Sequence, residues 1–158
     1  MVKSKLVQGG DGTAISSGMA GEVKAAGCSE LDQNTPTIAT YYDLTGTLDL
    51  GPGNWDIFVS AAVSMQFPGG TISGVNCPYT TLALRSGAST IEQSVYCGAG
   101  NVSGVVHLGA ATLTKSVDLT AASTIYKLSA KWAQFSGSGS TVGKLAVYTP
   151  ILYAVRRA

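Results

Sequence analysis

The chain has a single histidine, His107 in the stretch GVVHLG, and it is the first residue to consider for acid–base chemistry. A serine triad needs a histidine that is held by a carboxylate and faces an activated serine. No G-x-S-x-G elbow is present to carry such a serine. Because a lone histidine in an apolar strand is more often a packed residue, we predict a structural role for His107.

Three aspartates, Asp43, Asp49 and Asp56, are candidates for the two carboxylates that glycoside hydrolysis requires. Asp49 and Asp56 flank the Gly-Pro-Gly-Asn turn at 51–54, where aspartate is an ordinary turn or strand-edge residue. The stretch GGDG at 9–12 lacks the further oxygen ligands of a calcium loop. We therefore predict no catalytic, cofactor-binding or metal-binding residue, and we expect that the protein is not an enzyme.

The three cysteines, Cys28, Cys77 and Cys97, have no C-x-x-C spacing that would indicate a metal site. Their odd number, and an N-terminus MVKSKLVQGG without the apolar region of a secretory signal, favour reduced and buried thiols. A bridge between Cys77 and Cys97 stays open, because spacing alone does not establish one.

The net charge and the lengths of the apolar runs argue against two classes of partner. Ten Lys and Arg face nine Asp and Glu, a net charge of +1, whereas nucleic-acid-binding proteins usually show a basic stripe and a pI above about 9. No apolar run reaches the roughly 18 residues of a membrane-spanning helix. We predict neither a nucleic-acid partner nor membrane insertion.

The elements that must position these residues are strands. From Trp55 to Met65 apolar residues recur at every second position, including Ile57 and Val59, and this period indicates a half-buried strand. The stretch TIYKLSAKWAQF places Trp132 on the apolar face of another strand in the same way. We expect Trp55, Ile57, Val59 and Trp132 in the core, with Trp55 at one end of it.

Strand patterns separated by turn residues continue along the chain, and none is helical. They are typical of an all-β fold, an antiparallel β-sandwich of the jelly-roll type with about eight strands. In the last predicted strand Pro150 should lie at a sheet edge or a bulge, and one face of this strand should carry Leu145, Val147, Ile151, Tyr153 and Val155. The predicted strands cover 37–44, 55–65, 80–85, 92–97, 104–108, 113–119, 124–135 and 144–156.

The two ends of the chain differ from the sandwich between them. Residues 1–20 are rich in Gly and Ser, and are either a frayed terminus or an extended N-terminal arm; residues 21–158 form the knob. An arm would dock on a neighbouring subunit or a larger assembly through Leu6, Val7, Ile15 and Met19. At the other end, Arg156 and Arg157 are either solvated or clamp a carboxylate of another subunit or a partner.

Three motifs together resemble a known family. They are MAGEVKAAG at 19–27, LDLGPGNWDIFV at 48–59 and the closing strand ILYAVRRA at 151–158. Their order and spacing are similar to those of bacteriophage tail-fibre and virion-surface domains of the C1q/TNF-like jelly-roll type, over residues 20–158. The resemblance implies a homotrimeric knob on the exterior of a phage particle, with Trp55 as a core residue.

This resemblance implies contacts with a host-surface glycan or protein, for which the predicted loops 67–76, 86–89, 98–104 and 136–140 are candidates. A fibre-shaft repeat is absent from the sequence, so a capsid decoration protein anchored by the arm is the alternative. A trimer also has a physical motive: a second apolar parity, at Phe58 and Ala62 and at Leu152 and Ala154, needs cover outside one core.

Overall fold

A computed structural model describes residues 18–66, 78–97, 106–120, 122–134 and 142–157, and these residues contain ten strands and no helix. Accordingly, no helix in the described ranges is long and apolar enough to cross a membrane. The strands are β1 (Val23–Ala26), β2 (Leu31–Asn34), β3 (Tyr42–Asp43), β4 (Leu48–Leu50), β5 (Gly53–Gln66), β6 (Pro78–Ser86), β7 (Ser89–Cys97), β8 (Val106–Leu119), β9 (Thr124–Gln134) and β10 (Lys144–Arg156).

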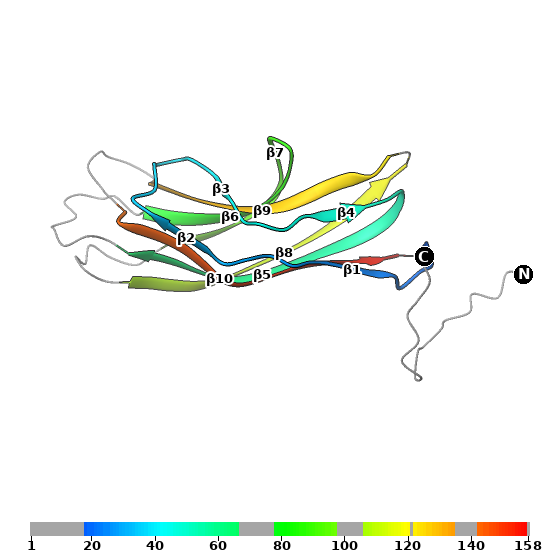
Figure 1. Cartoon of the computed structure of the whole chain (residues 1–158), viewed down its shortest axis with the longest axis horizontal. Coiled ribbons are helices and arrows are strands. Elements are labelled where there is room, and N and C mark those ends of the chain that lie inside the picture. Colours follow the sequence, from blue (N-terminus) through cyan, green and yellow to red (C-terminus); the bar gives the residue numbers. More distant parts are fainter. Residues whose placement is uncertain (1–17, 67–77, 98–105, 121, 135–141, 158) are drawn as a thin grey trace, which may run out of the picture.

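The strands form two five-stranded sheets that pack face to face (Figure 1). In sheet one, β1 and β2 both pair with β10, which is followed by β5 and β8. In sheet two, β3 and β4 both pair with β9, which is followed by β6 and β7. Every pairing is antiparallel.

The pairing is nested in the way that defines a jelly roll. The hairpin β6–β7 is innermost, β5 pairs with β8 around it, β4 pairs with β9, and β1 and β2 pair with β10 outermost. A long antiparallel ribbon that is wrapped on itself in this manner places alternate layers of the ribbon in opposite sheets. The predicted all-β jelly-roll sandwich is confirmed.

The core lies between the sheets, and the alternation of each long strand supplies it. Trp55, Ile57 and Val59 point inward from β5, and Trp55 has no exposed surface. Trp132 and its apolar neighbours at every second position point inward from β9, and are buried as well. These side chains form one continuous hydrophobic cluster with Leu82 and Leu84 of β6.

The strand count and one predicted strand differ from the sequence prediction. The three short strands β1, β2 and β4 were not predicted, while residues 106–108 of the predicted strand 104–108 and the predicted strand 113–119 are parts of the single strand β8. The predicted strand 37–44 is wrong except at Tyr42–Asp43, because Ala39 adopts a left-handed φ of 60°. The start of this segment instead lies beside β9 without regular strand pairing, and there the Ala39 N–H donates to the Trp132 carbonyl at 2.8 Å.

A bulge in β10 reverses the direction of its side chains. The register with β5 shifts between Tyr148 and Ile151, and Thr149 there has a φ of 47°, so the bulge predicted at Pro150 is present. One extra residue moves all following side chains to the opposite face. The residues of β10 that face the core are Leu145 and Val147 before the bulge and Leu152 and Ala154 after it.

Two predictions for β10 are therefore wrong. Ile151, Tyr153 and Val155 do not share the face of Leu145, because the bulge turns them outward. Leu152 and Ala154 belong to the core and not to a second apolar face.

Several predicted residues lie outside the described part of the chain. They are Leu6, Val7, Ile15 and Cys77, together with the loops 67–76, 98–104 and 136–140. The backbones of Cys97 and His107 lie in β7 and β8, but their side chains are outside the description. Cys28 is a half-buried free thiol, and burial raises its pKa.

Candidate interaction surface

The three aspartates considered for glycoside hydrolysis lie in separate surroundings. Asp49 is exposed on β4 of sheet two, and Asp56 lies on β5 of sheet one. Asp43, on β3, accepts a hydrogen bond from Ser129 at 2.5 Å and pairs with Lys127. Among the described residues, no group of three or more His, Cys, Asp or Glu side chains could hold a metal ion.

The outer face of sheet one is the broadest uncharged surface that the strand register defines. The register aligns three rows of outward residues across this sheet, and all are apolar or carry only hydroxyl groups. We call these rows the sheet-one face: Ala25–Tyr153–Phe58–Thr114, then Ile151–Ser60–Thr112, then Tyr148–Ala62–Ala110.

An aromatic pair lies in the first row of the sheet-one face. The rings of Phe58 and Tyr153 stack with their centroids 5.0 Å apart and an interplanar angle of 17°. Beside them, Ile151 is 53% exposed, and Val23 at the edge of the sheet is 61% exposed. Exposed apolar side chains that are contiguous, unlike single scattered ones, mark interaction surfaces.

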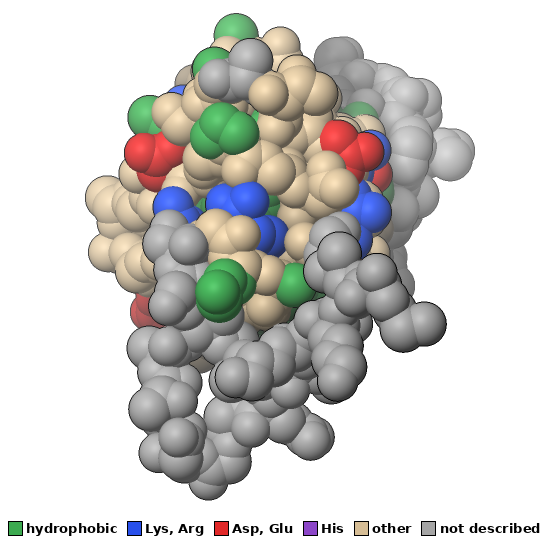
Figure 2. Space-filling model, turned by 90° about the vertical axis from the view of Figure 1, so that its right-hand side faces the viewer, with side chains coloured by type: hydrophobic (Ala, Val, Ile, Leu, Met, Phe, Trp, Pro, Cys, Tyr) green, Lys and Arg blue, Asp and Glu red, His purple; other side chains and the backbone are tan. Residues whose placement is uncertain are grey.

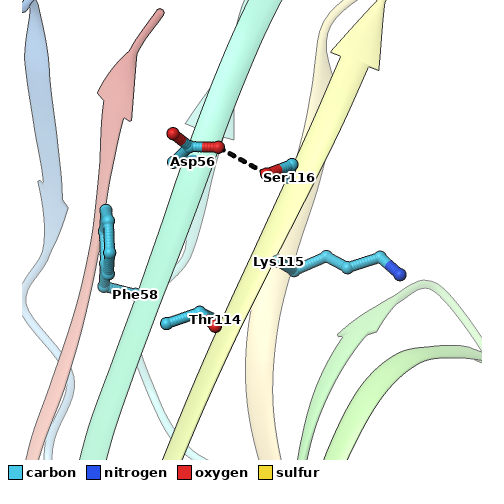
Figure 3. Close-up of a pocket in the computed structure, with 5 residues that line it drawn as sticks. All are labelled: Asp56, Phe58, Thr114, Lys115 and Ser116. Atoms are coloured by element: carbon cyan, nitrogen blue, oxygen red, sulfur yellow. Dashed lines mark hydrogen bonds between the residues drawn. The ribbon is translucent and has the colours of Figure 1, made fainter.

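A shallow depression of about 270 Å³ borders the aromatic pair. It is lined from β5 and β8 by Asp56, Phe58, Thr114, Lys115 and Ser116, and the Ser116 hydroxyl donates to the Asp56 carboxylate at 2.5 Å (Figure 3). The Lys115 side chain points away from the other four, toward the β7 hairpin, where it meets Glu92 at 3.5 Å (Figure 3). The depression is smaller than most small-molecule sites, which begin at about 300 Å³.

The charged end of the sandwich adjoins this face, where the C-terminus meets β1 and the β4–β5 turn. Figure 2 looks onto this end, and Lys and Arg side chains gather near its centre with acidic side chains on either side. Arg156 is the buried member: its Nε donates to Glu22 at 2.9 Å and its Nη1 donates to the Pro52 carbonyl at 2.8 Å. Its guanidinium lies 4.4 Å from the centre of the Trp55 ring.

The neighbouring Arg157 lies on the surface of the same end. It meets Asp56 at 3.2 Å and Asp118 at 2.6 Å. Both predicted arginines thus bind carboxylates, but those carboxylates belong to their own chain. The solvated reading of Arg156 is wrong, because its side chain is only 14% exposed.

The N-terminal segment leaves the sandwich at this end too. The Gly18 N–H donates to the Glu22 carboxylate at 2.6 Å, and Met19 is 56% exposed. Glu22 therefore joins the beginning of the described chain to its C-terminal strand through Arg156. Of the four apolar residues predicted to dock an arm, Met19 alone lies in the described part, and it is available for contact.

Sequence reasoning found part of the sheet-one face. Phe58 and Ala62 were recognised as a second apolar parity, but their neighbours Tyr153 and Ile151 were predicted on the same face as Leu145. The missed signal was Pro150, since a bulge at that position requires the parity of the following residues to change.

The strand pairing defines the class of this chain, a jelly-roll β-sandwich. Its sequence matches no protein-family model and no curated protein. Among solved structures it is similar to the infectious bursal disease virus Gx strain, with a TM-score of 0.47, 7% identity and coverage of 92% of this chain. It is also similar to Eiger TNF from S. frugiperda, with a TM-score of 0.47, 10% identity and coverage of 88% of this chain.

A third similar structure is the infectious bursal disease virus VP2 subviral particle, with a TM-score of 0.37, 14% identity and coverage of 87% of this chain. The chain spans 37% and 38% of the two viral chains, and 94% of the Eiger chain.

Proposed function

We propose that this chain is a non-enzymatic structural protein of a bacteriophage particle. In this proposal it is a homotrimeric β-sandwich knob on the particle exterior, a short tail-fibre or tail-tip component that contacts the host receptor. The assignment to a phage and the number of three subunits come from the resemblance of the three sequence motifs. The observation that supports association of the subunits is the sheet-one face.

The sheet-one face is suited to a second copy of the chain. Its three rows contain no formal charge, so covering it removes no ion from water. The stacked rings of Phe58 and Tyr153 supply apolar area in its first row, and aromatic residues are enriched at protein interfaces. Ion pairs border it at both ends, Lys144 with Asp32 and Arg157 with Asp118.

The mass of the protein in solution tests this assembly. Light scattering should give three times the 16.1 kDa mass of the chain. Phe58→Glu should yield folded monomers, because it introduces a charge within the covered face. Ile125→Glu is the matched control: Ile125 is 54% exposed on β9 of sheet two, so this variant should remain trimeric. A wild-type protein that is monomeric at micromolar concentration contradicts the proposed trimer.

The alternative is a capsid decoration protein that binds the head through residues 1–20. The position of Gly18 favours this alternative, because Gly18 lies at the same end of the sandwich as the C-terminus (Figure 1). An arm that attaches there would hold the knob by one end only. Gold-labelled antibody on phage particles distinguishes the two: label over the head facets indicates decoration, and label at the tail indicates a fibre or tip. Particles without label contradict both.

Deleting residues 1–17 tests the arm as the anchor and leaves the Gly18–Glu22 hydrogen bond intact. If the arm anchors a decoration protein, the deletion should abolish binding to particles while the knob stays folded. Undiminished binding would exclude the arm.

A further inference from the structure

Five side chains gather on the outer face of sheet two, opposite to the sheet-one face. The guanidinium carbon of Arg85 lies 4.5 Å from the centre of the Tyr41 ring, and the Lys131 ammonium lies 4.4 Å from the same centre. Asp43 binds Lys127 and Arg85 beside them. We call Tyr41, Asp43, Arg85, Lys127 and Lys131 the Tyr41 cluster.

The Tyr41 cluster has an excess of positive charge. Arg85 and Lys127 share the carboxylate of Asp43, and Lys131 forms no ion pair with a carboxylate of the described residues. Burial disfavours the charged form of Asp43, but hydrogen bonds from Lys127 and Ser129 outweigh burial and hold its pKa below the usual value. The excess of two charges therefore persists at neutral pH.

Four other cations of the described chain are neutralised by carboxylates. Each of them faces at least one carboxylate: Lys115 faces Glu92, Lys144 faces Asp32, Arg156 faces Glu22, and Arg157 faces Asp56 and Asp118. In a chain with 12% charged residues, two cations against one ring and a third cation on the adjacent Asp43 carboxylate are a concentrated placement of positive charge.

Arg85 is incompletely satisfied within the cluster. Its Nη2 donates to the Ala88 carbonyl at 3.0 Å, and its Nη1 reaches Asp43 at a long 3.4 Å. Its Nε is buried and has no hydrogen-bond partner among the described residues. A buried donor without a partner calls for an explanation such as a bound ion or ligand.

The segment that carries Tyr41 is held in a strained conformation. Thr35 and Ala39 both have left-handed φ values, 44° and 60°, which non-glycine residues rarely adopt. The Trp132 Nε1–H donates to the Pro36 carbonyl at 2.8 Å and fixes the segment against β9. Strained backbone that is fixed by its surroundings is concentrated at binding sites.

We propose that the Tyr41 cluster binds a carboxylate group of an acidic polysaccharide. Lys131 and Arg85 are within about 9 Å of each other, the sum of their distances to the ring, so one bound carboxylate or two neighbouring ones can meet both. Gln93 and Val95 are exposed on the adjacent strand β7, and offer an amide and an apolar surface to hydroxyl and C–H groups. This inference rests on the proposed contact with a host surface, which it assigns to sheet two.

Two features favour a saccharide over other polyanions. Two surplus charges suit an acidic sugar better than a nucleic acid, which requires a longer basic stripe. The cluster also lies on the sheet opposite to the proposed subunit interface, and it would remain accessible in the assembled knob.

Binding of polygalacturonate to the full-length protein tests the inference, with neutral dextran and polyglutamate as competitors. Wild-type protein should bind polygalacturonate, and should bind more weakly as salt rises from low ionic strength to about 0.5 M, where surface charges are screened. Lys131→Gln should weaken binding roughly tenfold, because a hydrogen bond to a charged group is lost. Lys24→Gln is the matched control at the opposite end of the sandwich and should bind like wild type.

Each possible result bears on a different part of the inference. Absence of wild-type binding, or unchanged binding by Lys131→Gln, overturns the inference. Equal competition by polyglutamate overturns the saccharide class, and equal competition by dextran overturns the role of the carboxylate. Light scattering measures the mass of each variant and so tests assembly separately from binding. If the protein is a trimer but does not bind polygalacturonate, this inference fails and the proposed trimeric knob does not.

Discussion

Replacing Arg156 with alanine tests how the two ends of the described chain are held together. Arg156 and Glu22 form an ion pair in which the side chains are 14% and 8% exposed. The neighbouring Arg157 pairs with Asp118, but there the side chains are 39% and 66% exposed. The same substitution at adjacent positions therefore removes a buried pair in one variant and a surface pair in the other.

The expected magnitudes differ because removal of one partner leaves the other charge buried only in the first case. Removing one member of a buried ion pair lowers the free energy of unfolding by about 3–5 kcal/mol. We expect about 3 kcal/mol for Arg156→Ala, at the low end of that range, because the Gly18 N–H still donates to Glu22. For Arg157→Ala we expect less than about 1 kcal/mol.

Urea unfolding at one fixed protein concentration measures both losses, since subunit assembly makes the apparent stability depend on concentration. In thermal unfolding, a loss of ~3 kcal/mol corresponds to a Tm about 6–12 °C lower for a domain of this size. Glu22→Gln completes a double-mutant cycle, in which the coupling with Arg156 should be about 0.5–3 kcal/mol. Equal losses for the two arginine variants, or no coupling with Glu22, would refute the buried-pair reasoning.

Two further predictions concern the core and the Tyr41 cluster. Trp55→Ala should lower the free energy of unfolding by about 3–5 kcal/mol in urea titrations, because the fully buried indole leaves a cavity; a loss below about 1 kcal/mol would contradict its place in the core. Asp43 has a lowered pKa, so its contribution to stability is present above its ordinary pKa of 3.8 and is lost as the pH falls through the folded-state value. Asp43→Asn should therefore be less stable than wild type at pH 6, with a difference that shrinks below pH 3.8; a pH-independent difference would contradict this sign.

The long strands were predictable because their two faces have different surroundings. One face of β5 packs into the core while the other is open, and the apolar side chains of Trp55, Ile57 and Val59 follow that difference at every second position. The short strands β1, β2 and β4 contain three or four residues each, too few for a period to emerge. Their place at the edges of the sheets is set by pairing with β9 and β10, which are more than 70 residues away in the sequence.

Local composition misled the prediction wherever a distant contact determined the backbone. The segment 37–44 has the β-branched and aromatic residues of a strand, yet beside β9 it pairs as a strand only at Tyr42–Asp43, and the Ala39 N–H donates to the Trp132 carbonyl. In β10, alternation was counted through Pro150 as though the pairing were continuous. The bulge adds one residue there, and it places Ile151 and Tyr153 on the sheet-one face and not on the face of Leu145.

The two candidate surfaces differ in how far the sequence could reveal them. The sheet-one face repeats along strands, so a corrected parity for β10 would have predicted it. The Tyr41 cluster joins β3, β6 and β9 with the segment before β3, and nothing in the spacing of Tyr41, Arg85 and Lys131 indicates that they meet. Lys127 and Lys131 alternate with apolar residues in the strand pattern, and that pattern does not show that the Tyr41 ring lies against Lys131. The surface proposed for assembly is therefore visible in the pattern of single strands, whereas the proposed ligand site on the opposite sheet depends on contacts between residues that are distant in the sequence.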